Sequence, residues 1–188
     1  MVERTRRIVV ADYDLQWPEV AARLIATLEE ACGVALVRVE HIGSTSVPGL
    51  AAKPVIDLAP VVARYEDGER CLAPIVALGY EHRGEYGIPG RRYFRGTDAT
   101  SGLDVHAHLF PRDAVELRHH LVFRDYLRSH PDEREAYAAT KRELATRLWA
   151  DGNEYADAKT PFISACLERA EAWAVKTGWR ALSDVREA

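Results

Sequence analysis

The segment His41–Val62, HIGSTSVPGLAAKPVIDLAPVV, constrains the fold more than any other part of the chain. A Gly-Ser turn and a proline-containing loop separate two apolar runs, and the second run carries a lone carboxylate, Asp57. Because successive side chains of a strand point to opposite faces, Asp57 shares one face with Val55, Ala59 and Val61. We therefore expect two strands joined by this loop, with Asp57 presented on one face of a sheet.

The Gly-Ser turn also indicates a phosphate site. Gly43 allows the backbone to come close to a ligand, and the hydroxyl groups of Ser44 and Thr45 add hydrogen-bond donors. Lys53 lies in the loop that should face the phosphates, and Asp57 would hold Mg²⁺ or Mn²⁺. In the alternative interpretation, the glycine only shapes a loop and Asp57 only pairs with a nearby basic residue.

A second polar pattern lies in LDVHAHLF, residues 103–110. Strand alternation places Asp104, His106 and His108 on one face and apolar residues on the other. We expect Asp104 and His106 to join Asp57 as metal ligands, and His106 or His108 to serve as a ligand or a general base. A solvated strand face would produce the same alternation.

The rest of the chain predicts a single domain over residues 1–188, with a sheet-containing core (1–112) and a helical part (113–188). Expected helices are 17–32, 66–78, 113–129, 131–150 and 153–177. Expected strands are 35–42, 54–62, 80–83, 91–96 and 103–110, after a short strand-like run at 8–14 and with no strand in the helical part. Trp179 and the residues after it are expected to form a frayed end.

Composition excludes several classes of protein. The net charge of −4, from 29 acidic and 25 basic residues, argues against binding of bulk nucleic acid. Three widely spaced cysteines predict neither a disulfide framework nor a thiolate zinc site, and they suit a reducing cytoplasm. No apolar run is long enough to span a membrane, and the charged start does not resemble a signal peptide. The sequence does not indicate an oligomeric state.

The helical part offers further candidates for anion binding. Arg124 and Arg128 are four residues apart and share a helix face, and Lys141 and Lys159 each follow a tyrosine by one turn. Arginine and lysine both suit phosphate. In the alternative interpretation, the arginines pair with neighbouring acids, and the lysine stems cover tyrosines that pack in the core.

Several motifs together carry a family resemblance: DYD before WPEVAARL, then HIGSTSVPGLAAKPVID, VHAHLF, FRDYLRSHP and YADAKTPFI. In this order they resemble the GrpB-like family of the nucleotidyltransferase superfamily. The resemblance implies an α/β (α+β) fold with a mixed sheet flanked by helices, and a C-terminal helical part that closes over the site. It favours Arg124, Lys141 and Lys159 as phosphate ligands. Related domains look to be fused to dephospho-CoA kinase in some bacteria.

Gly43 and Ser44 correspond to the Gly-Ser turn of the nucleotidyltransferase superfamily. In that superfamily the next strand usually carries two acids separated by one residue, and a later strand carries a third acid. Asp57 fills the first position, but Ala59 stands at the second, so LDVHAHLF would have to complete the set. The resemblance implies a protein that binds a nucleoside triphosphate with Mg²⁺ and transfers a nucleotidyl group to, or activates, a small-molecule acceptor. The alternatives are a nucleotide-binding module without turnover and a metal-dependent hydrolase that uses the His-x-His strand.

Overall fold

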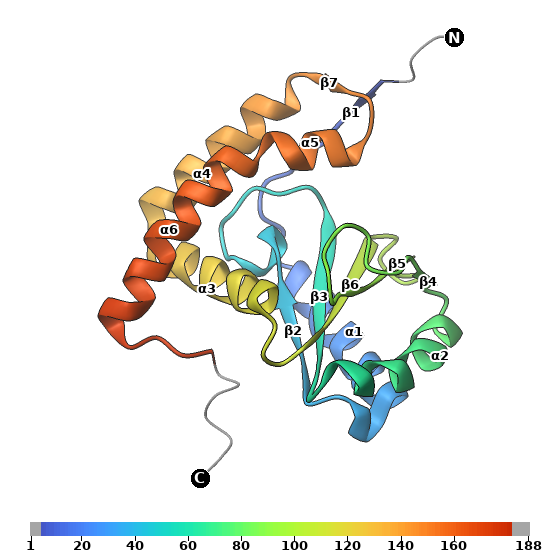
Figure 1. The fold of residues 1–188 in the computed structure, drawn as a ribbon. Coiled ribbons are helices and arrows are strands. Elements are labelled where there is room, and N and C mark those ends of the chain that lie inside the picture. Colours follow the sequence, from blue (N-terminus) through green and yellow to red (C-terminus); the bar gives the residue numbers. More distant parts are fainter. Residues whose placement is uncertain (1–4, 182–188) are drawn as a thin grey trace.

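The computed structural model describes residues 5–181, and its centre is a five-stranded mixed sheet. The strand order is β2-β3-β6-β5-β4, in which β3 and β6 run parallel and all other neighbours run antiparallel. The strands are β2 (Arg38–Ile42), β3 (Val55–Val62), β4 (Glu81–His82), β5 (Arg92–Thr97) and β6 (Asp104–Pro111). The expected mixed α/β fold is confirmed (Figure 1).

One face of this sheet packs against α1 (Trp17–Cys32) and α2 (Glu69–Ala77). Pro18 lies in the first turn of α1, where a missing N–H costs nothing, and this helix has the bounds predicted from the sequence. The apolar residues that alternate with the polar ones along β3 and β6 point to this side. They form the main core with α1: Ile56, Leu58, Val62, Val105, Ala107 and Leu109.

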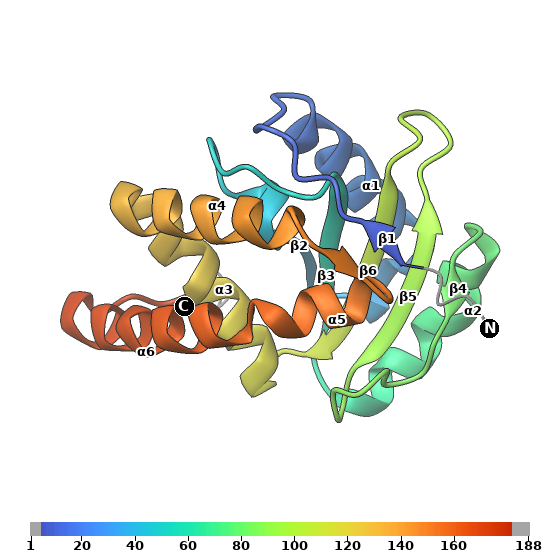
Figure 2. The ribbon, with the colours of Figure 1, turned by 90° about the horizontal axis from the view of Figure 1, so that it is seen from above.

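The other face lies towards the C-terminal helices, which Figure 1 shows grouped on the opposite side from α1 and α2. Figure 2 shows α4 and α6 extending side by side away from the sheet, and α3 and α6 pack against each other. These helices are α3 (Val115–Ser129), α4 (Pro131–Ala145), α5 (Gly152–Ala158) and α6 (Thr160–Thr177). Within residues 5–181, no helix combines the length and apolar character needed to cross a bilayer.

Two expectations about the helical part are wrong. The helix expected at 131–150 ends at Ala145, and the strand β7 (Leu148–Trp149) follows it and pairs with β1 (Arg6–Arg7). This partner is more than a hundred residues away in the chain, so local periodicity could not reveal it. The helix expected at 153–177 is two helices, because Pro161 in the first turn of α6 lacks the N–H that a continuous helix requires.

The expected fraying at Trp179 is also wrong. The indole Nε1 donates a hydrogen bond to Asp125 Oδ2 at 3.2 Å, and the guanidinium of Arg118 lies 5.4 Å from the ring centroid. Gly178, at φ +66°, ends α6 and turns the chain back. Residues 182–188 lie outside the described residues. The strand-like run at 8–14 contributes one bridge, between Ala11 and Ala52.

Arg124 connects α3 to the sheet. Its Nη1 donates to Glu40 Oε2 at 2.8 Å and to the His41 carbonyl at 3.1 Å, and its Nε donates to Asp125 Oδ1 at 2.7 Å. The side chain is only 5% exposed. Arg128 donates to the Ser46 carbonyl through Nε and Nη2. Both arginines therefore make hydrogen bonds within the protein, and these hydrogen bonds hold the turn after β2 against α3.

We predict that Arg124→Ala lowers the free energy of unfolding by about 1.5–3 kcal/mol, because Glu40 Oε2 and the His41 carbonyl lose their donor, although Arg38 still donates to Glu40 Oε1. Urea denaturation followed by circular dichroism measures the change. Arg147→Ala is the control, since Arg147 and its partner Glu143 are 57% and 72% exposed, and we expect a change below about 0.5 kcal/mol. Equal effects of the two substitutions would show that Arg124 is not a structural anchor.

Candidate functional site

The site is built where β3 and β6 run side by side. Asp57 and His106 are direct register partners, and His108 lies two residues further along β6. His106 Nδ1 lies 3.4 Å and His108 Nε2 3.3 Å from Asp57 Oδ1. Among the described residues, these three form the group of side chains whose ligand atoms, all within 4.8 Å of one another, could hold a metal ion.

The electrostatics of Asp57 favour the charged carboxylate. Burial alone would raise the pKa of Asp57, but the hydrogen bonds and charges of His106 and His108 outweigh burial and hold that pKa well below its usual range. Burial lowers the pKa of His108. At neutral pH the cluster therefore holds a carboxylate beside a neutral His108.

Two arginines from the neighbouring strand region contact the outer nitrogens of the histidines. Arg95 Nε donates to His106 Nε2 at 3.3 Å, and Arg91 Nη1 lies 3.1 Å from His108 Nδ1. Tyr93, between them in sequence, lies against both imidazole rings, with ring centroids 5.7 and 5.0 Å away. The antiparallel register of β5 and β6 pairs Arg95 with His106 and Tyr93 with His108.

The Gly-Ser turn lies directly against the carboxylate. Ile42 is the register partner of Asp57, and Gly43 follows at φ +70°. A Cβ at position 43 would lie 2.5 Å from Asp57 Oδ2, so only glycine fits both the backbone angle and the space. Thr45 is buried and uses its hydroxyl within the protein, donating to the Val55 carbonyl at 3.0 Å.

Three lysines line a cavity of about 230 Å³ beside Asp57, Ser44 and His106. Lys53 comes from the loop before β3, Lys141 from α4 and Lys159 from the junction of α5 and α6. Lys141 is 2% exposed, and its Nζ has no hydrogen-bond partner among the described residues. Burial, together with the charges of Lys159 and Arg142, lowers the pKa of Lys141 to about 6. Burial also lowers the pKa of Lys159.

Each of these two lysines lies against a tyrosine. Lys141 Nζ is 4.4 Å from the centroid of the Tyr137 ring, and Lys159 Nζ is 4.9 Å from that of Tyr155. Burial raises the pKa of Tyr137 well above its usual range and that of Tyr155 to about 12, so both phenols stay neutral. Their ring faces lie against the two lysine amino groups, a contact that favours the charged form of each lysine.

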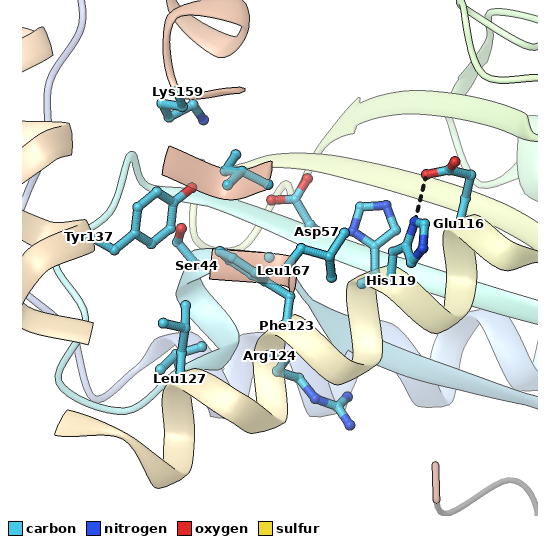
Figure 3. Close-up of a pocket in the computed structure, with 14 residues that line it drawn as sticks. Ser44, Asp57, Glu116, His119, Phe123, Arg124, Leu127, Tyr137, Lys159 and Leu167 are labelled. Atoms are coloured by element: carbon cyan, nitrogen blue, oxygen red, sulfur yellow. Dashed lines mark ion pairs between the residues drawn. The ribbon is translucent and has the colours of Figure 1, made fainter. Parts of the chain in front are cut away.

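Two further cavities adjoin the lysine-lined cavity. One, of about 290 Å³, shares Ser44, Asp57 and Lys159 with it and is also lined by α3 and α6. These helices contribute apolar residues (Phe123, Leu127, Ile163 and Leu167) and polar ones (Glu116, His119, His120 and Arg124). Figure 3 shows the hydroxyl groups of Ser44 and Tyr137 close together in this cavity, with Asp57 and Lys159 beyond them. The other, of about 590 Å³, shares Lys53 and His106 and is polar; it is also lined by Arg7, Arg95, Asp104, Tyr86, Tyr93 and Asn153.

The structure brings together most of the residues expected from the sequence: Gly43, Ser44, Thr45, Lys53, Asp57, His106, His108, Lys141 and Lys159. Asp104 lines the cavity of about 590 Å³ with Lys53 and His106, but it is exposed at the start of β6, opposite Val55, and is not a member of the metal-capable group. Arg124 lines the 290 Å³ cavity, but Figure 3 shows its guanidinium directed away from Asp57. Its Nη1 donates instead to Glu40 Oε2.

Arg91, Tyr93 and Arg95 also belong to the site and were not expected there from the sequence. Alternation along GRRYFRG places these three side chains on one face of a strand, and that was the available signal. Their role depends on β5 pairing with β6, and only the structure reveals that pairing.

The comparisons with known proteins agree on the family. A family model described as GrpB protein matches residues 7–169. A UPF0157 protein of Streptomyces coelicolor is 44% identical over 165 residues, which cover 88% of this chain and 85% of the relative. The crystal structure of the conserved protein GrpB from Enterococcus faecalis has a TM-score of 0.77 at 34% identity, covering 88% of this chain and 99% of that one.

Two further matches concern the fold and the length of related chains. The Cid1 poly(U) polymerase, solved with MgGTP bound, has a TM-score of 0.51 at 13% identity, covering 72% of this chain and 44% of that one. At this identity the match shows a shared nucleotidyltransferase-like fold. A dephospho-CoA kinase of Mycobacterium bovis is 32% identical over 197 residues, which cover 93% of this chain but 48% of the kinase. This chain therefore matches about half of the kinase, which agrees with the expectation that related domains are fused to dephospho-CoA kinase in some bacteria.

We predict that Gly43→Ala destabilises the protein by about 1–3 kcal/mol more than Gly33→Ala does, because the added methyl group meets the Asp57 carboxylate. Gly33 is a matched control: it also has a positive φ, of +53°, but an added Cβ there meets nothing within 4 Å among the described residues. Chemical denaturation of both variants measures the difference. Equal losses would mean that only the backbone angle, and not the contact with Asp57, requires glycine at position 43.

Proposed function

This chain belongs to the GrpB protein family, and from that premise we propose that it is a nucleotidyltransferase-type protein. It binds a nucleoside triphosphate with Mg²⁺ or Mn²⁺ and transfers the nucleotidyl group to a small-molecule acceptor, or uses the nucleotide to activate that acceptor. The observation that carries the proposal is the convergence of Lys53, Lys141 and Lys159 on one cavity beside Ser44 and Asp57.

This arrangement is costly for the protein without a ligand. The charges of Lys159 and Arg142 disfavour the protonated form of Lys141, and no described hydrogen-bond acceptor meets its buried Nζ. A triphosphate supplies several anionic oxygens that accept hydrogen bonds from ammonium groups. Such a ligand would restore the charged form of Lys141 and explain why a buried lysine stands at this position.

Asp57 fits a divalent ion that the nucleotide itself helps to hold. Mg²⁺ takes oxygen ligands and is commonly bound by one or two carboxylates together with substrate phosphates and water. Asp57 offers such an oxygen, and the ion would neutralise charge on the phosphates during transfer. A second carboxylate is absent at the expected position, where Ala59 is fully buried beside Val61 and Phe110.

The adjoining cavities support transfer between two substrates. A transferase needs space on both sides of the phosphates, one for the nucleoside and one for the acceptor. The lysine-lined cavity has a neighbour of about 290 Å³ that shares Ser44 with it, and another of about 590 Å³ that shares Lys53. Cavities of this size accommodate small ligands.

We also propose that the protein acts in the cytoplasm. Its three cysteines are buried and free, which suits a reducing compartment.

A nucleotide-binding module without turnover is the second candidate, and Ala59 favours it. Two-metal catalysis needs several anionic ligands close together. With Ala59 in β3 and Asp104 exposed and outside the metal-capable group, Asp57 is the one carboxylate in that group among the described residues. Such a site could bind a nucleotide without promoting transfer.

Calorimetric titration with ATP, GTP, CTP and UTP, with and without Mg²⁺, tests the proposal. We expect at least one nucleotide to bind, and we expect Ser44→Ala and Asp57→Ala to weaken that binding by about tenfold or more, whereas Lys176→Ala on the exposed side of α6 does not. If no nucleotide binds under either condition, the proposal is wrong. Pyrophosphate release in the presence of a metabolite pool then distinguishes a transferase from a binding module.

Lys141 gives a prediction in which stability and binding change in opposite directions. Lys141→Met should raise the free energy of unfolding at pH 7 by about 1–3 kcal/mol, because a buried amine without a hydrogen-bond partner is removed. The same change should weaken nucleotide binding. Lys176→Met, on an exposed lysine, is the control for both measurements.

The stability gain should depend on pH. Lys141 has a pKa of about 6 in the folded protein, against 10.5 for a free lysine side chain. Between these values the unfolded chain binds more protons than the folded one, so the free energy of unfolding of the wild type rises with pH. The advantage of Lys141→Met should therefore be largest near pH 6 and shrink towards pH 10.5. A gain that does not vary with pH would contradict the assignment of a depressed pKa to Lys141.

A further inference from the structure

We propose that His106 and His108 are positioning residues that donate hydrogen bonds to Asp57, and that they do not bind the metal ion of this site. Arg95 and Arg91 impose the imidazole tautomers that make this possible. The inference deepens the proposed function and rests on it only for the role of the nucleotide; the hydrogen-bond chain itself can be tested without one.

The two arginines determine which ring nitrogen of each histidine is unprotonated, because a guanidinium can only donate hydrogen bonds. Arg95 Nε donates to His106 Nε2 at 3.3 Å, so Nε2 is the unprotonated nitrogen of that ring. The proton of a neutral His106 is then on Nδ1, which lies 3.4 Å from Asp57 Oδ1. His106 therefore directs an N–H group at the carboxylate.

His108 also lies between an arginine and Asp57, but with the two ring nitrogens exchanged. Arg91 Nη1 lies 3.1 Å from His108 Nδ1, so Nδ1 must be the acceptor. The proton is then on Nε2, which lies 3.3 Å from Asp57 Oδ1. The two imidazoles thus donate to the same carboxylate oxygen from two positions of β6.

These tautomers are the opposite of those that a metal site needs. A histidine that binds a metal uses an unprotonated nitrogen and donates its other N–H to a carboxylate, a carbonyl or water. If His106 and His108 bound an ion beside Asp57, their outer N–H groups would face the donors of Arg95 and Arg91. Each ring would then exchange a hydrogen bond for a contact between two donors, and two guanidinium charges would lie close to the cation.

Arg91 cannot easily turn away to relieve that conflict. Its residue is 5% exposed, its Nη2 donates to the Tyr86 carbonyl at 2.7 Å and its Nε donates to the Glu85 carbonyl at 3.2 Å. The guanidinium also lies 4.6 Å from the centroid of the Tyr93 ring. Arg91 is therefore fixed by the loop before β5, and the tautomer of His108 is fixed with it.

One oxygen of Asp57 remains for an ion. Oδ1 receives both imidazole N–H groups, whereas Oδ2 lies on the side of Gly43. An ion bound through this oxygen needs its other ligands from nucleotide phosphates and water. The geometry therefore points to a site that takes up its divalent ion with the nucleotide, and not to a preformed two-histidine, one-carboxylate centre.

The tautomers can be measured directly in the full-length protein. Long-range ¹H–¹⁵N correlation spectra at neutral pH should identify His106 as the Nδ1–H form and His108 as the Nε2–H form, with the signals assigned by His106→Asn and His108→Gln. The opposite tautomer at either residue would overturn the inference. This measurement needs no nucleotide, so its result stands apart from the success or failure of the proposed function.

Substitutions of His106 and His108 distinguish hydrogen-bond donation to Asp57 from metal binding. In His106→Asn an amide replaces the ring near the position of Nδ1, and in His108→Gln an amide lies near the position of Nε2, so each variant can still donate to Asp57. We expect both to keep the affinity for the nucleotide that binds, measured with Mg²⁺, within about threefold of the wild type, whereas His106→Ala and His108→Ala lose about tenfold or more. His82→Asn, at an exposed histidine of β4, is the control.

Titration with Zn²⁺ and with Mn²⁺ tests the alternative, in which the two histidines bind a metal ion. Titrated with Zn²⁺ or Mn²⁺ alone, the wild type should show no stoichiometric binding that depends on these histidines. Stoichiometric binding that disappears in His106→Asn and His108→Gln would establish a histidine metal centre and overturn the inference. If none of the four nucleoside triphosphates binds the wild type, the proposed function fails, and the spectra and the metal titrations still decide the role of the histidines.

Discussion

The parallel pairing of β3 with β6 is the interaction on which the rest of this site depends. It sets Asp57 opposite His106 and brings His108 to the same carboxylate oxygen. The neighbouring strands then complete the site on either side. Antiparallel pairing with β2 puts the glycine of the Gly-Ser turn against Asp57, and antiparallel pairing with β5 puts Arg95 beside His106. A register shift of one residue in β6 would turn both histidines into the core.

Much of this could be predicted from local pattern. The α1 helix, the two central strands and the alternation that presents Asp57 and His106 follow from hydrophobic periodicity, which depends on near neighbours in the chain. The failures are long-range. The strand at Leu148–Trp149 needs β1 as its partner, and Trp179 needs Asp125. Asp104 has the correct parity but lies at the start of β6, opposite Val55 and not Asp57, because register is a property of paired strands and not of one segment.

The charge distribution differs from that expected of a site with three carboxylates. Among the described residues, the metal-capable group contains one carboxylate, whereas three lysines line the adjoining cavity and two arginines contact the histidines. Cations so arranged repel one another, and burial adds to the cost of charging Lys141. Proteins retain such unfavourable groups where function requires them, and on our proposal a ligand with several negative charges would complement these lysines and arginines.

The same distribution of charge accounts for an alanine at position 59. A second carboxylate would attract a second metal ion and would also compete with phosphate for the lysines. Without it, Asp57 needs support that holds it charged and correctly oriented, and on our proposal two imidazole donors provide that support while the lysines take over much of the neutralisation of phosphate. The substitution of an acid by alanine then need not mean a loss of function. It would accompany a change from a site whose charge is carried by metal ions to one whose charge is carried mainly by the protein.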